Sequence, residues 1–260
     1  MNLDCLPTSS ACDTSLADQL LQGQALFLNE HSIPDSLRNG EARILSTPEQ
    51  AQRYLQMRGD VFLKDSQRRY ANLDPQGELF VEPCDFDATH SWFERDGKVL
   101  YAIRMQSAPS ALNNANYVDL QPLLAGRVSA RDVLMTRFFT PRAQKAGFRE
   151  VFALFQLNYE IAMRCEKRFG FLTCSPLHAK FFSKIGFAPI DAYQCRFSGE
   201  QKVMAMDIWD RENLVRSKSP LVAVNDRVIA EIGGAPPTNP KLNDHQGDAH
   251  DDRQTDPLEG

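Results

Sequence analysis

The stretch CSPLHAKFFSKIGF, residues 174–187, is the most informative part of this sequence. A short apolar strand at 171–173 leads into it, and Pro176 stands in the first turn of a helix, where proline is favoured. Gly186 suits the left-handed residue that often ends a helix. The helix between them has one apolar face, made of Leu177, Phe181, Phe182 and Ile185. The pattern predicts a strand and a short amphipathic helix at the end of an α/β domain.

The composition excludes two classes of protein. The chain has 260 residues, of which 42% are hydrophobic, so it can bury a sizeable core. Its net charge is −5 and no basic stripe follows a predicted helix, which argues against a nucleic-acid partner. No apolar run approaches the roughly 20 residues that span a bilayer, and the N-terminus lacks the pattern of a signal peptide. We therefore expect no transmembrane segment.

The cysteines and histidines do not form the spacings of a metal site. The six cysteines contain no C-x-x-C motif, and the five histidines show no paired ligand spacing. Without a sign of export, reduced thiols are the default. The sequence predicts a cytoplasmic protein without a metal.

Three parts of different composition follow one another. We expect residues 1–40 to be a partly ordered extension, because they carry only one apolar patch. Residues 41–219 form the predicted domain, and residues 220–260 form a C-terminal segment. From about residue 233 that segment is rich in Gly, Pro, Asn and Asp and poor in large apolar groups, which predicts an acidic disordered tail.

Within 41–219 the hydrophobic pattern alternates between helix and strand. Thr47 and Pro48, with Gln50 three residues after the threonine, form a helix start. Strands are expected at 98–106 and 133–139, a long amphipathic helix at 148–169, and an antiparallel pair at 190–197 and 202–209. The order predicts one sheet with helices on its faces. The loop 107–127, with Asn-Asn-Ala-Asn at 113–116, is long enough for a lid or an insertion.

Charged residues occur where a core is expected. Arg58 lies in the apolar stripe of the helix after Thr47, and Arg104 and Arg137 lie in core-like strands. Three carboxylates that repel one another cluster nearby in the sequence: Glu82, Asp85 and Asp87. Because a buried charge needs a partner, we expect the arginines to pair with carboxylates. The alternatives are an arginine that snorkels at the helix edge and an exposed acidic loop.

The order of these residues resembles a known signature. Arg58-x-x-x-Phe62, then Glu82-x-x-Asp85-x-Asp87 ahead of a strand ending in Arg104, then Thr136-Arg137-Phe138, is similar to the pattern of acyl-homoserine lactone synthases and the related N-acyl amino acid synthases. The similarity spans roughly residues 43–210. It implies an α/β, GNAT-like fold in a single domain, with a mixed, mostly antiparallel central sheet flanked by helices.

The resemblance also implies roles for particular residues. The carboxylates would orient the acceptor's ammonium group and take its proton, while the strand arginines would hold the carboxylates or the acceptor's own carboxylate. The implied catalytic residues are Glu82, Asp85, Asp87, Arg104 and Arg137. The implied substrate contacts are Arg58, Phe62, Thr136 and Phe138, and the implied contacts to the acyl donor are Arg142, Gln144 and Gly147.

Three departures concern the donor and the chemistry: the first is from the pattern of these synthases, and the other two are from that of ordinary GNAT enzymes. Leu134 stands where an acidic residue is usual, and Asp132 is the nearest carboxylate. Phe148 occupies the last small position of the phosphate-binding loop, where backbone must approach phosphate closely. The usual tyrosine of the closing helix is replaced by phenylalanine. An acyl-carrier protein or a long-chain donor therefore becomes more plausible than acetyl-CoA.

These observations predict an N-acyltransferase that moves an acyl group from acyl-ACP or acyl-CoA, as co-substrate, to a small-molecule amine such as an amino acid. No permanently bound cofactor is expected. The alternatives are an acyl-homoserine lactone synthase and a non-catalytic module that binds an acyl carrier or another protein. Several phenylalanines fit either a core or an acyl tunnel, and a core is the simpler interpretation: Phe138, Phe139, Phe152 and Phe155.

Overall fold

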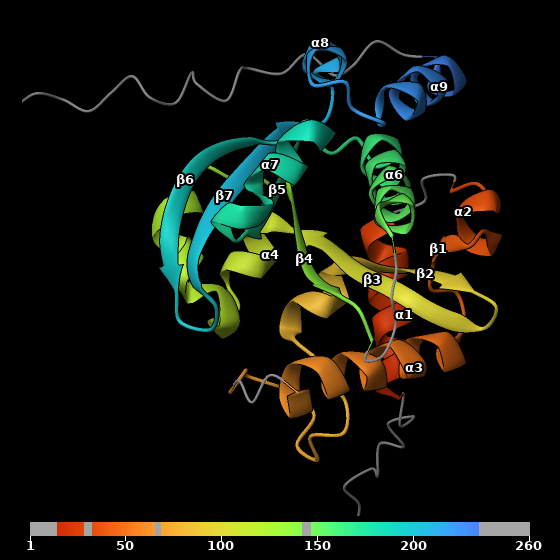
Figure 1. Ribbon diagram of the computed structural model, residues 1–260. Helices are drawn as coiled ribbons and strands as arrows, with labels where there is room; N and C mark the ends of the chain where they lie inside the picture. Colours follow the sequence, from red (N-terminus) through yellow and green to blue (C-terminus); the bar gives the residue numbers. More distant parts are fainter. Residues whose placement is uncertain (1–14, 29–32, 66–68, 142–146, 234–260) are drawn as a thin grey trace, which may run out of the picture.

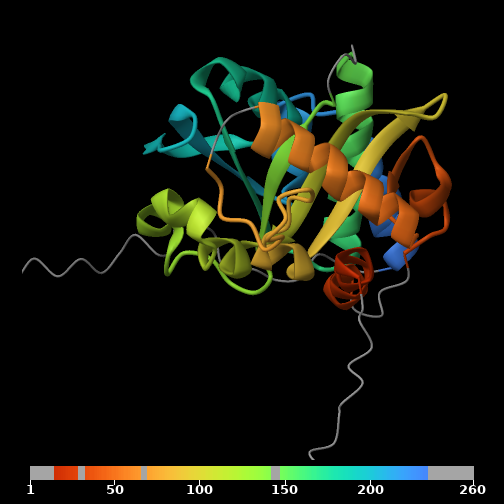
Figure 2. The ribbon, with the colours of Figure 1, turned by 90° about the horizontal axis from the view of Figure 1, so that it is seen from below.

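The computed structural model describes residues 15–28, 33–65, 69–141 and 147–233. The predicted donor contacts Arg142 and Gln144 and the predicted disordered tail lie outside the described residues, except for the tail's first position. Figures 1 and 2 show the chain from two sides.

The strands make one sheet, and among the described residues seven of them pair in the order β1-β2-β3-β4-β5-β7-β6. All neighbours are antiparallel except β4 and β5, which are parallel. This matches the predicted mixed, mostly antiparallel sheet. The strands are β1 (Ala42–Ile44), β2 (Ala88–Arg95), β3 (Lys98–Ser107), β4 (Val133–Phe139), β5 (Phe169–Cys174), β6 (Ala188–Cys195) and β7 (Gly199–Asp207).

Helices cover both faces of the sheet (Figure 1). The longer ones are α1 (Leu16–Leu28), α3 (Pro48–Gly59), α6 (Phe148–Arg164), α7 (Pro176–Ile185) and α9 (Val222–Ile232). The shorter segments are α2 (Ser36–Asn39), η1 (Asp60–Asp65), η2 (Pro83–Asp87), α4 (Ala108–Leu112), η3 (Ala115–Leu120), α5 (Gln121–Leu124) and α8 (Arg211–Arg216). Among the described residues, no helix has the length and apolar character needed to cross a bilayer.

The two faces have separate cores. One core packs α6, α7 and α9 against strand residues such as Met135 and Leu172. On the opposite face, α1 and α3 pack over Trp92 and Phe139, and the segment from α4 to α5 packs over Leu134. Figure 2 shows α3 crossing in front of the strands, with the yellow-green segment around α4 and α5 beside it.

Local sequence signals set several boundaries as expected. The Thr47 hydroxyl accepts a hydrogen bond from the Gln50 backbone N–H at 3.3 Å, and Pro48 is the first residue of α3. Gly186 ends α7 with φ of 120°, and a Cβ there would meet Leu214 Cδ2 at 2.7 Å, so only glycine suits the position. The long helix is shorter than expected: α6 ends at Arg164, before a left-handed turn at Glu166.

The two ends of the described chain belong to the same packed unit as the middle. Leu20 on α1 is fully buried, and Gln24 donates to the Leu45 carbonyl at 2.7 Å and accepts from the His90 backbone N–H at 2.9 Å. On α9, Asn225 donates to the Tyr159 hydroxyl of α6 at 2.8 Å. Both terminal helices therefore pack on the domain expected at 41–219.

Candidate active site

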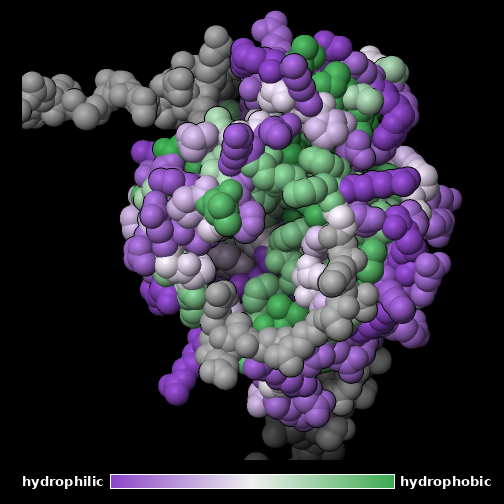
Figure 3. Space-filling model, in the orientation of Figure 1, coloured by the Kyte–Doolittle hydropathy of each residue, from purple (hydrophilic) through white to green (hydrophobic). Residues whose placement is uncertain are grey.

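The sheet divides where β4 and β5 separate. The two strands pair only from Val133–Met135 to Gly170–Leu172. Beyond these pairs β4 continues beside β3, and β5 continues beside β7. A cavity of about 820 Å³ lies at this division. Figure 3 shows it as a hollow in the molecular surface with hydrophobic side chains on its walls.

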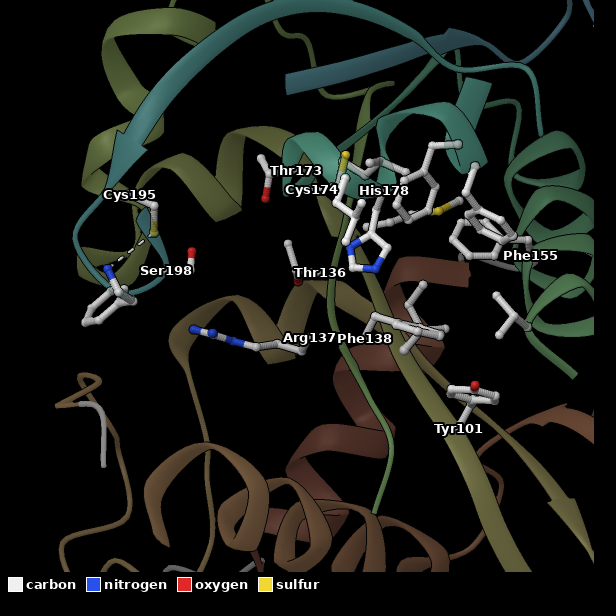
Figure 4. A pocket seen from close by; sticks show the side chains of 18 of the residues that line it. Tyr101, Thr136, Arg137, Phe138, Phe155, Thr173, Cys174, His178, Cys195 and Ser198 are labelled. Carbon is white, nitrogen blue, oxygen red and sulfur yellow. Dashed lines mark hydrogen bonds between the residues drawn. The ribbon is translucent and has the colours of Figure 1, made fainter. Parts of the chain in front are cut away.

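The cavity reaches both faces of the sheet, because side chains alternate along each strand. On one face it has a polar lobe, lined by Thr136, Arg137, Thr173, Tyr117, Asp119 and Phe197. On the other it has an apolar lobe, lined by Ile103, Met135, Phe138, Val151, Phe155 and Leu172. Figure 4 shows Thr136 and Thr173 on one side of β4, and Tyr101, Phe138 and Phe155 on the other.

A chain of alternating charges lies behind the polar lobe, and we call it the buried cluster: Arg58, Asp85, Arg104, Glu82 and Arg137. Arg58 binds Asp85 through both carboxylate oxygens, with Nη1 to Oδ1 at 2.8 Å, and Arg104 also contacts Asp85. Arg104 Nη1 lies 2.9 Å from Glu82 Oε2. Arg137 donates from Nε and Nη2 to the two Glu82 oxygens at 2.7 and 2.6 Å.

Local geometry brings the members of the buried cluster together. Asp85 accepts from the Glu82 backbone N–H at 2.7 Å, which closes the first turn of η2. Arg104 on β3 is paired with Thr136 on β4, and its Nε donates to the Thr136 hydroxyl at 3.2 Å. Arg58 lies in the last turn of α3 and also donates to the Phe80 carbonyl. The structure therefore contains the predicted pairs between the arginines and the carboxylates Glu82 and Asp85.

The buried carboxylates stay ionised. Burial alone would raise the pKa of Glu82, but Arg137 and Arg104 outweigh it and hold that pKa at about 2. Burial opposes ionisation of Asp85 too, yet Arg58 and Arg104 keep its pKa well below the usual range. Both side chains are fully buried, and neither lines the cavity. The expected role of these carboxylates as proton acceptors does not fit this arrangement, whereas an electrostatic role does.

The cluster carries a net positive charge on its cavity side. Three guanidinium groups face two carboxylates, which leaves one positive charge. Arg137 is the member that reaches the cavity, with 7% of its side chain exposed. Aromatic rings surround its guanidinium carbon, the nearest being Tyr70 at 4.4 Å and Phe80 at 5.0 Å. Arg137 is therefore placed to bind an anionic group.

A β-bulge directs Arg137 into the cavity. The register pairs Ala102 with Phe139 and Arg104 with Thr136, so Arg137 and Phe138 together lie opposite the single residue Ile103. Arg137 has φ of 51°, in the left-handed region that non-glycine residues rarely adopt. Such bulges re-aim side chains beside functional sites and interrupt the ladder of backbone hydrogen bonds.

The other predicted site residues divide into three groups. Phe62, Thr136 and Phe138 line the cavity, as does Gly147, the N-cap of α6. Asp87 lies at the end of η2, does not line the cavity, and has no ion pair with the arginines among the described residues. Arg142 and Gln144 form the third group, because they lie outside the described residues. Asp132, the carboxylate nearest to Leu134 and not a predicted site residue, binds the backbone N–H groups of Ser129 and Phe169 and has a structural role.

Several cavity residues were not identified from the sequence. Tyr117 accepts from Arg104 Nη2 at 2.7 Å, and Asn116 donates to Glu82 Oε1 at 2.6 Å. Both come from η3, within the loop expected to be a lid or an insertion. His178 on α7 faces the cavity beside Cys174 (Figure 4), and its Nδ1 lies 2.9 Å from the Ser175 hydroxyl. In the described part of the chain no cluster of histidine, cysteine or carboxylate groups is arranged to hold a metal ion.

His90 predicts how stability depends on pH. Burial lowers the pKa of His90 to about 3, although Asp85 nearby opposes the shift. The unfolded chain therefore takes up a proton near pH 6.5 that the folded chain refuses, so stability present above pH 6.5 is lost as pH falls. Between pH 7 and pH 5 the free energy of unfolding should fall by about 2 kcal/mol. The carboxylates of the cluster do not titrate in this window.

The measurement is urea unfolding at pH 7 and pH 5 for the wild type and His90→Gln. The variant should lose most of this pH dependence, whatever its absolute stability. An equal fall in both proteins would mean that His90 is not the group responsible.

Comparison with known proteins places the fold. No family model and no curated protein matches the chain. Among solved structures, TofI in a ternary complex with an inhibitor and MTA is 15% identical, with a TM-score of 0.50, and the match covers 70% of this chain and 98% of that one. The fold is GNAT-like. This confirms the fold class that the resemblance implied.

Two other solved structures match over similar lengths. MesI, a CoA-dependent acyl-homoserine lactone synthase, is 20% identical, with a TM-score of 0.48 over 71% of this chain and 89% of that one. FeeM, an N-acyl amino acid synthase from uncultured soil microbes, is 15% identical, with a TM-score of 0.48 over 68% of this chain and 96% of that one.

Proposed function

We propose that the chain is an N-acyltransferase that moves an acyl group from a thioester to the amine of an amino acid or a related metabolite. The observation that carries the proposal is the cavity through the divided sheet. It joins an apolar lobe, suited to an acyl chain, to a polar lobe that contains Arg137. A thioester carbonyl placed between the lobes lies beside the β4 bulge.

The reaction requires positioning more than strong base catalysis. The amine nitrogen attacks the thioester carbon, the carbon–sulfur bond breaks, the nitrogen loses a proton and the sulfur leaves as a thiol. An α-amino group with a pKa of about 7.7–8.0 is mostly protonated at pH 7, but making it neutral costs only about 1 to 1.4 kcal/mol. Holding amine and carbonyl in line contributes up to about 7–11 kcal/mol. A backbone N–H freed at the bulge would add oxyanion stabilisation.

The proton has an exit that does not involve the buried carboxylates. His178 lines the cavity, and in the tautomer in which its Nδ1–H donates to the Ser175 hydroxyl, its Nε2 is free to accept a proton. Water in the open part of the cavity is the other acceptor. Glu82 and Asp85 would then fix Arg137 and Arg104, and Arg58 with Phe62 would hold the wall of the polar lobe.

The charge of the buried cluster favours an acceptor with a carboxylate. Its net positive charge, exposed through Arg137, attracts an anion. S-adenosylmethionine also has a carboxylate that Arg137 could bind, but its sulfonium group would be bound less favourably, because the aromatic faces that suit a cation already pack around Arg137. An amino acid is therefore favoured over the substrate of an acyl-homoserine lactone synthase. A cytoplasmic location belongs to this proposal, since both substrates are metabolites of that compartment.

The start of α6 favours a donor on a carrier protein. The Glu150 carboxylate accepts from the Gly147 backbone N–H at 2.9 Å and from its own backbone N–H, and Arg95 binds it at 2.9 Å. A helix N-terminus that binds pyrophosphate needs free N–H groups, and here a carboxylate occupies them. Exposed Lys180 and Lys184 on α7, at the cavity, suit an acidic carrier.

Glu150→Gln should therefore improve the use of acyl-CoA. Loss of the negative charge is expected to lower the KM for acyl-CoA about fivefold and to leave the KM for acyl-ACP nearly unchanged. Steady-state kinetics with the same acyl group on both carriers measures the shift. Glu212→Gln, on α8 away from the cavity, is the matched control. Equal changes for both donors would contradict a selective effect on the pyrophosphate.

The function itself is tested with the purified chain, acyl thioesters on ACP and on CoA, and a panel of amino acids together with S-adenosylmethionine. The expected result is release of free thiol together with an N-acyl amino acid, identified by mass spectrometry. An acyl-homoserine lactone as product would mean that the acceptor is S-adenosylmethionine and not an amino acid. Stoichiometric binding of acyl-ACP without thiol release would mean that the chain is a binding module and not an enzyme.

A further inference from the structure

The apolar lobe has a definite end along α6. The residues of α6 that line the cavity are Phe148, Val151 and Phe155, following Gly147 at the N-cap, and no residue of the helix beyond Phe155 lines it. With a rise of about 1.5 Å per residue, the lobe follows α6 for about 12 Å. Its depth therefore ends at Phe155.

Phe155 closes the lobe together with rings from two other elements. Its side chain is buried, with 3% exposed. Its ring centroid lies 5.7 Å from that of Phe182 on α7 and 6.3 Å from that of Phe138 on β4. Three aromatic rings from three separate elements thus meet across the end of the lobe.

The next position on the same side of the helix is filled and polar. Asn158 is fully buried and donates to the Ser91 hydroxyl at 2.9 Å and to the Leu154 carbonyl at 2.8 Å. An acyl chain that passed Phe155 would meet this amide rather than an apolar channel. The wall is therefore backed by a buried polar side chain of the core.

We propose that Phe155 sets the maximum length of the acyl chain that the protein accepts. The inference rests on the proposed function, because it assigns the apolar lobe to the acyl chain. Each methylene that the lobe buries should improve kcat/KM about fourfold, from the value of burying one CH₂. Chains that reach the ring of Phe155 gain nothing further and are rejected.

Two substitutions should move the preferred length in opposite directions. Phe155→Ala opens the end of the lobe, so the optimum should move to longer chains. The ratio of kcat/KM for a longer donor to kcat/KM for the donor that the wild type prefers should rise at least tenfold in this variant. Val151→Phe narrows the lobe one turn earlier, so the optimum should move to shorter chains. Phe152→Ala is the matched control: its ring stacks on Phe181 at 5.4 Å and does not line the cavity.

The experiment measures kcat/KM for a graded series of straight-chain acyl donors, from butyryl to palmitoyl, with one acceptor. Phe155→Leu, which keeps more of the volume, replaces the alanine variant if that one does not fold. A second readout needs no catalysis: thermal stabilisation by free fatty acids of graded length, on the same variants.

The outcomes separate this inference from the proposed function. Shifted length profiles in Phe155 and Val151 variants, with the Phe152 control unchanged, support the length limit. Turnover with an unchanged profile in all three overturns the limit but leaves the acyltransferase intact. Absence of turnover overturns the proposed function. The length limit is then tested by the fatty-acid profiles alone, and profiles that do not shift in the variants overturn the limit.

Discussion

Asp85→Asn is expected to lower the free energy of unfolding by about 3–5 kcal/mol, the cost of removing one partner of a buried ion pair. Asp85 has no exposed surface and binds two guanidinium groups that are equally buried, Arg58 and Arg104. Without its charge, the cluster would hold two uncompensated positive charges instead of one. The remaining hydrogen-bonding capacity of asparagine does not replace that attraction.

Urea unfolding at pH 7 measures this loss. The matched control is Asp226→Asn, because Asp226 pairs with Arg211 on the surface, where both side chains are about half exposed. That variant should unfold like the wild type, since exposed pairs contribute little. A loss of similar size in both variants, or none at Asp85, would contradict the view that the buried cluster stabilises the fold.

The predictions that held depended on local signals. The cap at Thr47 and the proline after it begin α3 where expected, and the glycine at 186 ends α7. Arginines within apolar runs also proved informative, because a buried charge requires a partner wherever it lies in the sequence. Arg58 and Asp85 are 27 residues apart in the chain yet form a bidentate pair.

What the sequence did not reveal depends on tertiary arrangement. Asp87 looks equivalent to Asp85 in a run of carboxylates, but the short 3₁₀ turn η2 directs only Asp85 and Glu82 to the arginines. The division between β4 and β5 has no local signature, since it follows from which strands continue to pair. Tyr117 and Asn116 enter the site from η3, whose sequence suggested only a loop.

The bulge shows why a strand pattern alone cannot position a side chain. Regular alternation along 133–139 would place Arg137 on the face of Met135, with the apolar lobe. The extra residue opposite Ile103 and the left-handed φ of Arg137 instead direct the guanidinium to Glu82 and the polar lobe. A single register shift therefore changes which lobe receives the positive charge.

Arg137→Met should reduce kcat/KM by about a hundredfold or more, because the variant loses the group that positions the acceptor, and small misplacements cost about that factor. Arg137→Lys should recover only part of the activity, since lysine keeps the charge but loses the two-pronged contact with Glu82 and the stacking on Tyr70. The acceptor's KM should rise as well, because the ionic contact with its carboxylate is lost.

A double variant separates a contact with substrate from a structural effect. Arg137→Met leaves two guanidinium groups facing two carboxylates, so the cluster loses its net positive charge, whereas adding Glu82→Gln restores the wild type's net charge of one without restoring the Arg137 side chain. If Arg137 binds the acceptor's carboxylate, the double variant stays inactive although its cluster has the wild-type net charge. The wild type and the single variant should then differ little with the decarboxylated form of the acceptor. Recovery of activity in the double variant would instead assign Arg137 a structural role, because the charge balance of the cluster would have been all that the substitution disturbed.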